Sequence, residues 1–309
     1  GLAVGGQWGG AMLLVTESAP ADKRGWYGAY AQAGAPMGVI LANLAFISVS
    51  ASMSDEAFLA WGWRLPFIAS ILLIAISLYI QLRMEDTEAF KALQAEQAAS
   101  PQQAVAERSP VFEAMRRYPR RILLAAGAFL SVQVTFYILI AFVIAYGLNS
   151  PTVDLTRDEL LVSVLVAAAI MMPAQFYFSG LSDRVGRKQI YRWGAILTGI
   201  WGFAIFPLVD TGMPIMITLA VTMGMVLLGM QYGPQAAYFT ELFATEVRYS
   251  GASLGYQIGA ILGGALAPTI AVLLWQELGI IYVSVYILVA ALLTLWCLSQ
   301  LEETGGKAL

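Results

Sequence analysis

Nine long stretches of this sequence contain no Asp, Glu, Lys or Arg, and each has at least 16 residues. They are residues 1–16, 25–54, 65–82, 122–153, 160–182, 193–209, 211–240, 249–276 and 278–301. An α-helix rises about 1.5 Å per residue, so about 20 apolar residues cross the hydrocarbon core of a bilayer. The 309-residue chain is 12% charged, against about 25% in soluble domains. The sequence therefore predicts an all-α integral membrane protein with nine transmembrane helices.

The sequence lacks the side chains on which several kinds of chemistry depend. It has no histidine and a single cysteine, Cys297. A zinc site, an iron–sulfur cluster and an internal disulfide therefore lack ligands or a partner. The nine stretches also hold no Ser-His, Cys-His or paired-acid arrangement. We expect no cofactor and no metal site, and the protein is not expected to be an enzyme.

Almost all basic residues fall in alternate loops. Of the 17 Lys and Arg residues, 15 lie in residues 20–26, 83–121, 181–192, 241–250 and 300–309. The opposite loops hold only Arg64 and Arg157. Cytoplasmic loops are rich in Lys and Arg. This pattern predicts a multi-pass protein of the cytoplasmic (inner) membrane with a cytoplasmic C-terminus, whose partners include the lipid bilayer and no nucleic acid.

The sequence contains an internal repeat. Four residues recur 224 positions later, where Gln7, Gly9, Glu17 and Arg24 return as Gln231, Gly233, Glu241 and Arg248. Three more recur after 225 positions, where Gln32, Gly34 and Gly38 return as Gln257, Gly259 and Gly263. Parallel repeats of helical bundles are typical of secondary transporters. Three spans precede the second copy and none precedes the first, so we expect a fragment that lacks three N-terminal spans.

The strongest local motif lies in a short loop between two spans and reads Ser182-Asp183-Arg184-Val185-Gly186-Arg187-Lys188. It resembles the Asp-Arg-x-Gly-Arg-Lys loop signature of the major facilitator superfamily. Residues 5–11, 61–67, 233–237 and 241–253 are similar to motifs of its metabolite:proton symporters of the shikimate, α-ketoglutarate and proline/betaine type. The resemblance implies a two-bundle fold of twelve spans, of which this chain would hold spans four to twelve. Gln7 departs from the family's usual Gly-Gly-Glu, which removes an ionisable group.

One long polar stretch, residues 83–121, divides the spans into two groups, and we interpret it as a cytoplasmic linker. Residues 1–82 would then be the second part of an N-terminal six-helix bundle, with spans four to six. Residues 122–299 would form a C-terminal six-helix bundle with spans seven to twelve. Residues 300–309 would be a cytoplasmic tail. On this division nine of the twelve transmembrane helices of a major-facilitator-type fold are present.

Charged residues at the predicted cytoplasmic ends of the spans form a candidate gate. A carboxylate there is costly in lipid unless a basic group holds it. Arg184 and Arg187 are the expected partners of Glu241, because arginine binds carboxylates through two parallel hydrogen bonds. Asp183 is expected to cap the following helix or a neighbouring one. The alternative is that these residues only anchor loops. The candidate network consists of Glu17, Arg24, Asp183, Arg184, Arg187, Glu241 and Arg248.

Polar side chains near the middle of three spans are candidates for substrate binding. They are Gln7, Trp8, Gln133, Tyr137, Gln231, Tyr232, Gln235 and Tyr238. Several are spaced four residues apart, which places them on one helix face, and the resemblance implies that these spans line the cavity. The alternative for each residue is a hydrogen bond between helices or an anchor at the membrane interface. Gln32, Gln257 and Asn43 are weaker candidates.

Proton coupling needs a titratable group, and no Asp or Glu lies in the nine stretches. The proton carrier could lie in the missing spans, or Glu17, Glu241 or Asp183 could act from the cytoplasmic end, or coupling could be lost. We hypothesise a secondary active transporter that moves a small polar metabolite, an organic acid or zwitterion, with protons by alternating access. It would function as a monomer when complete. The alternatives are an uncoupled facilitator and a non-transporting scaffold or sensor with the same fold.

Overall fold

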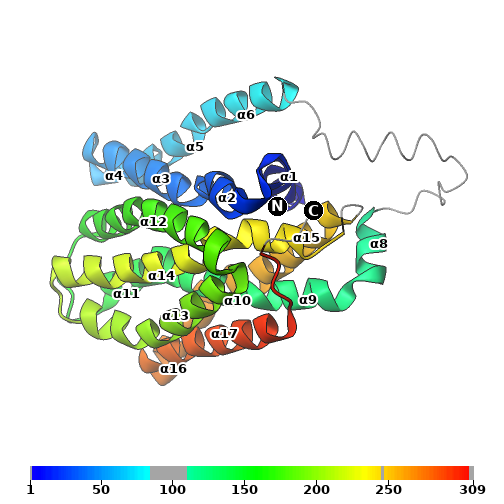
Figure 1. Ribbon diagram of the computed structural model, residues 1–309. Helices are drawn as coiled ribbons and strands as arrows, with labels where there is room; N and C mark the ends of the chain where they lie inside the picture. The colour runs from blue at the N-terminus through cyan, green and yellow to red at the C-terminus, as the bar shows by residue number, and fades with distance from the viewer. Residues whose placement is uncertain (1, 84–109, 245–246, 306–309) are drawn as a thin grey trace, which may run out of the picture.

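The computed structural model describes residues 2–83, 110–244 and 247–305, with side chains from residue 8 onward apart from residues 81 and 110. Every regular element in these ranges is a helix (Figure 1). Most of the predicted linker, residues 84–109, lies outside the described residues, as do residues 1, 245–246 and 306–309. The described end of the linker forms the short helix α8, Pro110–Arg117, and leads into α9 at Pro119.

The first six numbered helices, residues 2–83, are called the N-terminal half. They are α1 (Leu2–Ser18), α2 (Arg24–Gln32), α3 (Gly34–Ala51), α4 (Asp55–Ala60), α5 (Leu65–Ala69) and α6 (Ile71–Arg83). Short 3-10 turns, Ala21–Lys23 and Gly62–Arg64, lead into α2 and α5. α2 and α3 form one interrupted span, because α2 ends at Gln32 and α3 starts at Gly34. Pro36 has no backbone N–H to donate to the carbonyl of Gln32, which favours this break.

The helices from α9 to α17, residues 119–300, are called the C-terminal half. They are α9 (Pro119–Ala128), α10 (Leu130–Tyr137), α11 (Val143–Asn149), α12 (Arg157–Val185), α13 (Arg187–Val209), α14 (Pro214–Glu241), α15 (Arg248–Gly259), α16 (Ala267–Leu278) and α17 (Ile281–Gln300). A π-helical turn at Ile138–Phe142 joins α10 to α11, and another at Ala260–Ala265 joins α15 to α16. These joined helices form two long spans.

Eight helical stretches in the described residues are long and apolar enough to cross a membrane. They are residues 21–51, 62–80, 119–149, 157–185, 187–209, 214–241, 248–278 and 281–300. The ninth predicted span corresponds to α1, whose 17 residues overlap the charge-free stretch 1–16. The protein is therefore an all-α, multi-pass membrane protein, as the charge-free stretches predicted.

The two halves lie side by side, with the N-terminal half against one face of the C-terminal half (Figure 1). α2 and α3 pack against α12, α2 also packs against α14, and α1 packs against α14 and α15. Within the C-terminal half, α14 lies between α12 and α13, and α17 packs on α13 and α9. The buried apolar cluster belongs almost entirely to the C-terminal half.

Two local signals fix the ends of α12, which carries the loop motif. Thr156 caps its start, since its hydroxyl accepts from the backbone N–H of Glu159 while the Glu159 carboxylate accepts from the N–H of Thr156; this is a capping box. Gly186 ends the helix with a φ of 112°, a conformation that side chains with a Cβ rarely adopt. The chain therefore turns sharply between Asp183 and Arg187 and brings both into one cluster.

Candidate functional site

Arg187 lies at the centre of a buried charged cluster at the end of the bundle where the basic loops meet, which we call the basic end. Its side chain is 1% exposed. The guanidinium donates from Nε to Oε2 of Glu241 at 2.9 Å and from Nη2 to Oε1 at 3.1 Å. A third hydrogen bond runs from Nη1 to Oδ1 of Asp183 at 2.6 Å. Two parallel bonds to one carboxylate are strong and fix the orientation of the guanidinium.

Asp183 joins this cluster to the N-terminal half. Its Oδ1 accepts from the backbone N–H of Gly25 at 2.8 Å, and its Oδ2 accepts from the N–H of Trp26 at 2.9 Å. These N–H groups belong to the first turn of α2 and have no partner inside that helix. The positive end of the helix dipole adds to the attraction. Asp183 thus caps a neighbouring helix, one of the two possibilities that the sequence left open.

A second ion pair crosses between the halves through repeat-related residues. Arg248 donates from Nη1 to Oε1 of Glu17 at 3.1 Å, and both side chains are less than one-tenth exposed. The Nε of Arg248 also donates to the carbonyl of Phe243 at 3.1 Å. Arg24 is buried beside this pair, and the charges of Glu241 and Glu17 both act on it. The acid of the first repeat copy therefore binds the arginine of the second.

The expected pairing of Arg184 with Glu241 is not found. Its side chain is exposed and makes no hydrogen bond or ion pair with the residues that the structure describes. Of these two arginines it is Arg187 that binds Glu241, because the turn at Gly186 directs position 187 inward and leaves position 184 on the outer face of α12.

The C-terminal segment also docks on this cluster, which sequence reasoning missed. The carboxylate of Glu303 accepts from the backbone N–H of Arg187 at 2.9 Å and of Lys188 at 3.1 Å, and so caps the start of α13. The hydroxyl of Thr304 donates to Oε2 of Glu241 at 2.7 Å. The sequence held one signal for this contact, since Glu302-Glu303-Thr304 echoes Glu85-Asp86-Thr87 after the other half.

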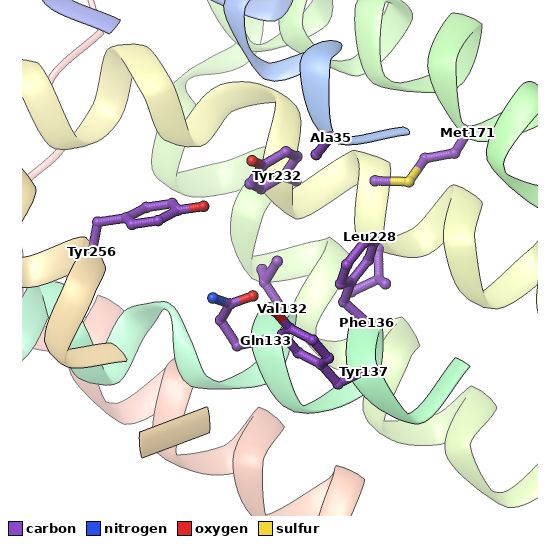
Figure 2. A pocket seen from close by; sticks show the side chains of 9 residues that line it. All are labelled: Ala35, Val132, Gln133, Phe136, Tyr137, Met171, Leu228, Tyr232 and Tyr256. Carbon is purple, nitrogen blue, oxygen red and sulfur yellow. The ribbon is translucent and has the colours of Figure 1, made fainter. Parts of the chain in front are cut away.

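A cavity of about 200 Å³ lies between the halves (Figure 2). Its wall is aromatic and apolar with one amide, and no lining side chain is charged. The lining residues are Ala35, Val132, Gln133, Phe136, Tyr137, Met171, Leu228, Tyr232 and Tyr256. Ala35 belongs to α3 and the others belong to the C-terminal half, so both halves contribute to the wall.

Three of the residues predicted to bind substrate line this cavity. Gln133 and Tyr137 project from α10, four residues apart as the helical spacing required, and Tyr232 projects from α14. Tyr256 of α15 was not predicted, because the sequence RYSGASLGYQIG gives no signal that separates it from the exposed Tyr249 of the same helix. Trp8 lies behind the wall, where its ring stacks on Tyr256 at a centroid distance of 4.1 Å.

The other predicted residues of α14 do not reach the cavity. Gln231 is fully buried and donates from Nε2 to the hydroxyl of Thr198 at 2.8 Å, which is the contact between helices that the sequence left as its alternative. Gln235 is fully buried, and neither polar atom of its side chain has a hydrogen-bond partner in the described structure. The hydroxyl of Tyr238 donates to the carbonyl of Glu302 at 3.0 Å. The side chain of Gln7 lies outside the described residues.

The cavity and the charged cluster lie one above the other along the same helices. On α14, Glu241 lies nine residues beyond Tyr232, which is about 14 Å along the axis. On α15, Arg248 precedes Tyr256 by eight residues, or about 12 Å. The charged cluster therefore lies beyond the cavity at the basic end, where the Glu17–Arg248 pair and the Asp183 cap hold the two halves together.

Comparison with known proteins gives a consistent result. Residues 1–255 match the Major Facilitator Superfamily. The chain is 36% identical over 317 residues to the inner membrane metabolite transport protein YhjE of Escherichia coli, covering 100% of this chain and 69% of YhjE. It is 34% identical to the shikimate transporter of Escherichia coli, covering 88% of this chain and 60% of that protein. The solved structure of the proton:xylose symporter XylE matches with a TM-score of 0.72 at 18% identity, over 96% of this chain and 68% of XylE.

Proposed function

Because this chain belongs to the major facilitator superfamily of transporters, we propose that it is a secondary active transporter that moves a small polar metabolite together with protons. The metabolite is an organic acid or a zwitterion, and transport proceeds by alternating access. In this proposal the protein acts in the cytoplasmic (inner) membrane with its C-terminus in the cytoplasm, and it works as a monomer.

The observation that carries the proposal is a cavity between the halves. Bonds from one half to the other close this cavity at one end. The Glu17–Arg248 pair and the Asp183 cap on α2 exist only while the halves touch at the basic end. Their energy therefore favours the state closed at that end, and a state open there must break them. A two-state equilibrium of this kind is what alternating access requires.

The cavity wall supplies the contacts that we assign to the substrate. The amide of Gln133 both donates and accepts, and the hydroxyls of Tyr137, Tyr232 and Tyr256 do the same. These groups suit the carboxylate or hydroxyls of an organic acid. The faces of the tyrosine rings also suit an ammonium group, which aromatic rings attract. This set of contacts supports both substrate classes.

Proton coupling is assigned to the charged network. Among the described residues the cavity wall has no carboxylate, so we assign the coupling proton to a carboxylate of the charged network, which is Glu17, Asp183 or Glu241. Glu241 and Arg187 both belong to the C-terminal half, but Arg187 also binds Asp183, which caps α2. A proton on Glu241 would weaken its two bonds to Arg187, loosen this link to the N-terminal half and so favour opening at the basic end. The uncharged wall also favours a second candidate function, uncoupled facilitated diffusion.

Uptake into membrane vesicles tests the proposal. Radiolabelled shikimate, proline and glycine betaine are supplied with an inward proton gradient, and a protonophore then collapses that gradient. Accumulation that disappears with the gradient supports symport, whereas equilibration that persists without it supports the facilitator. A Glu241→Gln variant that still equilibrates its substrate but no longer concentrates it would identify Glu241 as the coupling group. Absence of binding and uptake for every compound of these classes would contradict both functions.

A further inference from the structure

Gln32 lies at the break between α2 and α3, on the side of the N-terminal half that faces the C-terminal half. It is the last residue of α2, and its side chain is fully buried. A buried amide is costly unless its donor and acceptor both find partners. The partners of Gln32 therefore indicate what the residue holds together.

Both ends of the Gln32 amide are hydrogen-bonded, each to a different helix. The Oε1 accepts from Nε1 of Trp8 on α1 at 3.1 Å. The Nε2 donates to the backbone carbonyl of Tyr232 on α14 at 2.9 Å. One bond stays within the N-terminal half and the other crosses to the C-terminal half, so this side chain ties together three helices.

Both partners of Gln32 lead directly to the cavity wall. Tyr232 is itself a lining residue, and the Trp8 ring stacks on the lining residue Tyr256 with an angle of 17° between the planes. The side chains of Tyr232 and Tyr256 border the same cavity in Figure 2. The stack of Trp8 on Tyr256 is a second contact between the halves. A molecule that shifts the Tyr256 ring therefore disturbs its stack with Trp8, whose indole N–H is bonded to Gln32.

We propose that Gln32 is a positioning residue that couples the occupancy of the cavity to the closure of the two halves at the basic end. The inference rests on the proposed transport function, because it assigns Gln32 a part in that cycle. When the halves separate at the basic end, the Gln32–Tyr232 bond and the Trp8–Tyr256 stack break together with the Glu17–Arg248 pair. Substrate that moves the Tyr256 ring alters its stack with Trp8, which Gln32 orients, and so changes the free-energy difference between the closed and open states.

A distance measurement across the basic end tests this role. Spin labels are attached to cysteines introduced at Asp22 and Gln189, two exposed positions in different halves. Every other cysteine of the protein is first replaced by alanine, including Cys297 of this chain. The protein is expressed at the length that its gene encodes. Gln32→Leu removes one cross-half hydrogen bond, so we expect the ratio of closed to open protein to fall about fivefold. The distance distribution should move towards longer values.

Two further variants make the test decisive. Gln276→Leu changes an exposed glutamine on α16 and should leave the distribution as in the parent protein. Trp8→Phe removes the indole N–H but keeps a ring against Tyr256, so we expect a smaller shift in the same direction. If Gln32→Leu does not fold, the Trp8→Phe variant provides the test on its own. Unchanged distributions in both Gln32→Leu and Trp8→Phe would overturn the proposal.

A substrate readout separates coupling from a purely structural role. With a transported compound at saturation, the parent protein should change its distance distribution. The Gln32→Leu variant should bind the same compound with similar affinity and show at most a third of that change. An equal change in both proteins would overturn the coupling role. The first measurement needs no substrate, so failure to transport any tested compound would contradict the proposed function without deciding the role of Gln32.

Discussion

The spans of the two halves are similarly apolar, but the two halves bury very different shares of their residues. In the N-terminal half, 6% of the residues in the most apolar part of the span 21–51 are buried. In the most apolar part of the span 62–80, none is buried. In the six spans of the C-terminal half the corresponding shares run from 28% to 56%. Exposed apolar surface costs little in lipid. The C-terminal half is therefore packed as a unit, whereas the described part of the N-terminal half meets it through α1, α2 and α3 and through directional bonds such as the Glu17–Arg248 pair.

The packing around four repeat-related glycines differs between the halves in the same way. A Cβ at Gly259 would lie 2.7 Å from the carbonyl oxygen of Ala126, and one at Gly263 would lie 3.0 Å from Cβ of Gln133. The matching positions in the first repeat copy, Gly34 and Gly38, have nothing within 4 Å among the described residues. The same sequence signal thus marks tight packing in one half and an open helix face in the other.

The largest effect is expected at the charged cluster through which the halves meet. Arg187→Met leaves the carboxylates of Glu241 and Asp183 buried without their counter-charge, which costs about 3–5 kcal/mol. Hydrogen exchange should rise first in α2, whose N-terminus Asp183 caps. Thermal unfolding in detergent combined with hydrogen exchange by mass spectrometry measures both.

Arg184→Met is the matched control, because this arginine is exposed in the same motif. Its effect on unfolding should stay within about 0.5 kcal/mol. Equal losses of stability in the two variants would mean that the motif acts through its net charge. The difference in burial between Arg187 and Arg184 would then not explain the stability of the cluster.

The next largest effect tests the packing difference directly. Gly259→Ala places a methyl group against the backbone of α9, and overpacking of this kind costs about 1–3 kcal/mol. Gly34→Ala in the 309-residue chain meets nothing and should be neutral or slightly stabilising, since alanine favours helices. The measurement is the melting temperature of each variant in the same detergent. Similar melting temperatures for the two would remove the evidence that the halves differ in packing.

The spans could be predicted from the sequence, but the destination of most polar side chains could not. Charges are excluded from lipid, so the charge-free stretches mark the spans directly. α14 is apolar on every side and buried for much of its length, and hydropathy therefore gives no signal for which face meets the cavity. Gln231 and Gln235 lie on the helix face that was predicted to bind substrate, but neither lines the cavity. Tyr232, which follows Gln231 in the sequence, does line it.

For the charged network, the sequence predicted which residues take part better than it predicted which residues pair. The repeat identified Glu17, Arg24, Glu241 and Arg248 as related positions. Sequence spacing alone could not distinguish Arg187 from Arg184 as the partner of Glu241, because the choice depends on the turn at Gly186. Gln32 remained a weak candidate for a similar reason, since its role depends on contacts with α1 and α14 that lie 24 and 200 positions away.

A smaller effect is expected for the ion pair between repeat-related residues. A double-mutant cycle with Glu17→Gln and Arg248→Gln should give a coupling energy of about 1–2 kcal/mol, since the pair is buried but joined by a single bond. The cycle is measured on unfolding in detergent. A coupling energy near zero would mean that the pair does not hold the N-terminal half, and that the Asp183 cap carries this role.

The smallest effect compares two buried glutamines that differ in which helices they join. Gln175 of α12 donates from Nε2 to the carbonyl of Ala29 on α2 at 3.3 Å, across the halves. Gln231 donates to Thr198 at 2.8 Å, within the C-terminal half. Replacing either with leucine removes one hydrogen bond worth about 1 kcal/mol. We expect Gln175→Leu to raise hydrogen exchange in α2 while the C-terminal half stays protected, and Gln231→Leu to raise it in α13 and α14 instead. If both variants loosen the same helices, the halves unfold as one unit, and the N-terminal half is held by more than its directional bonds.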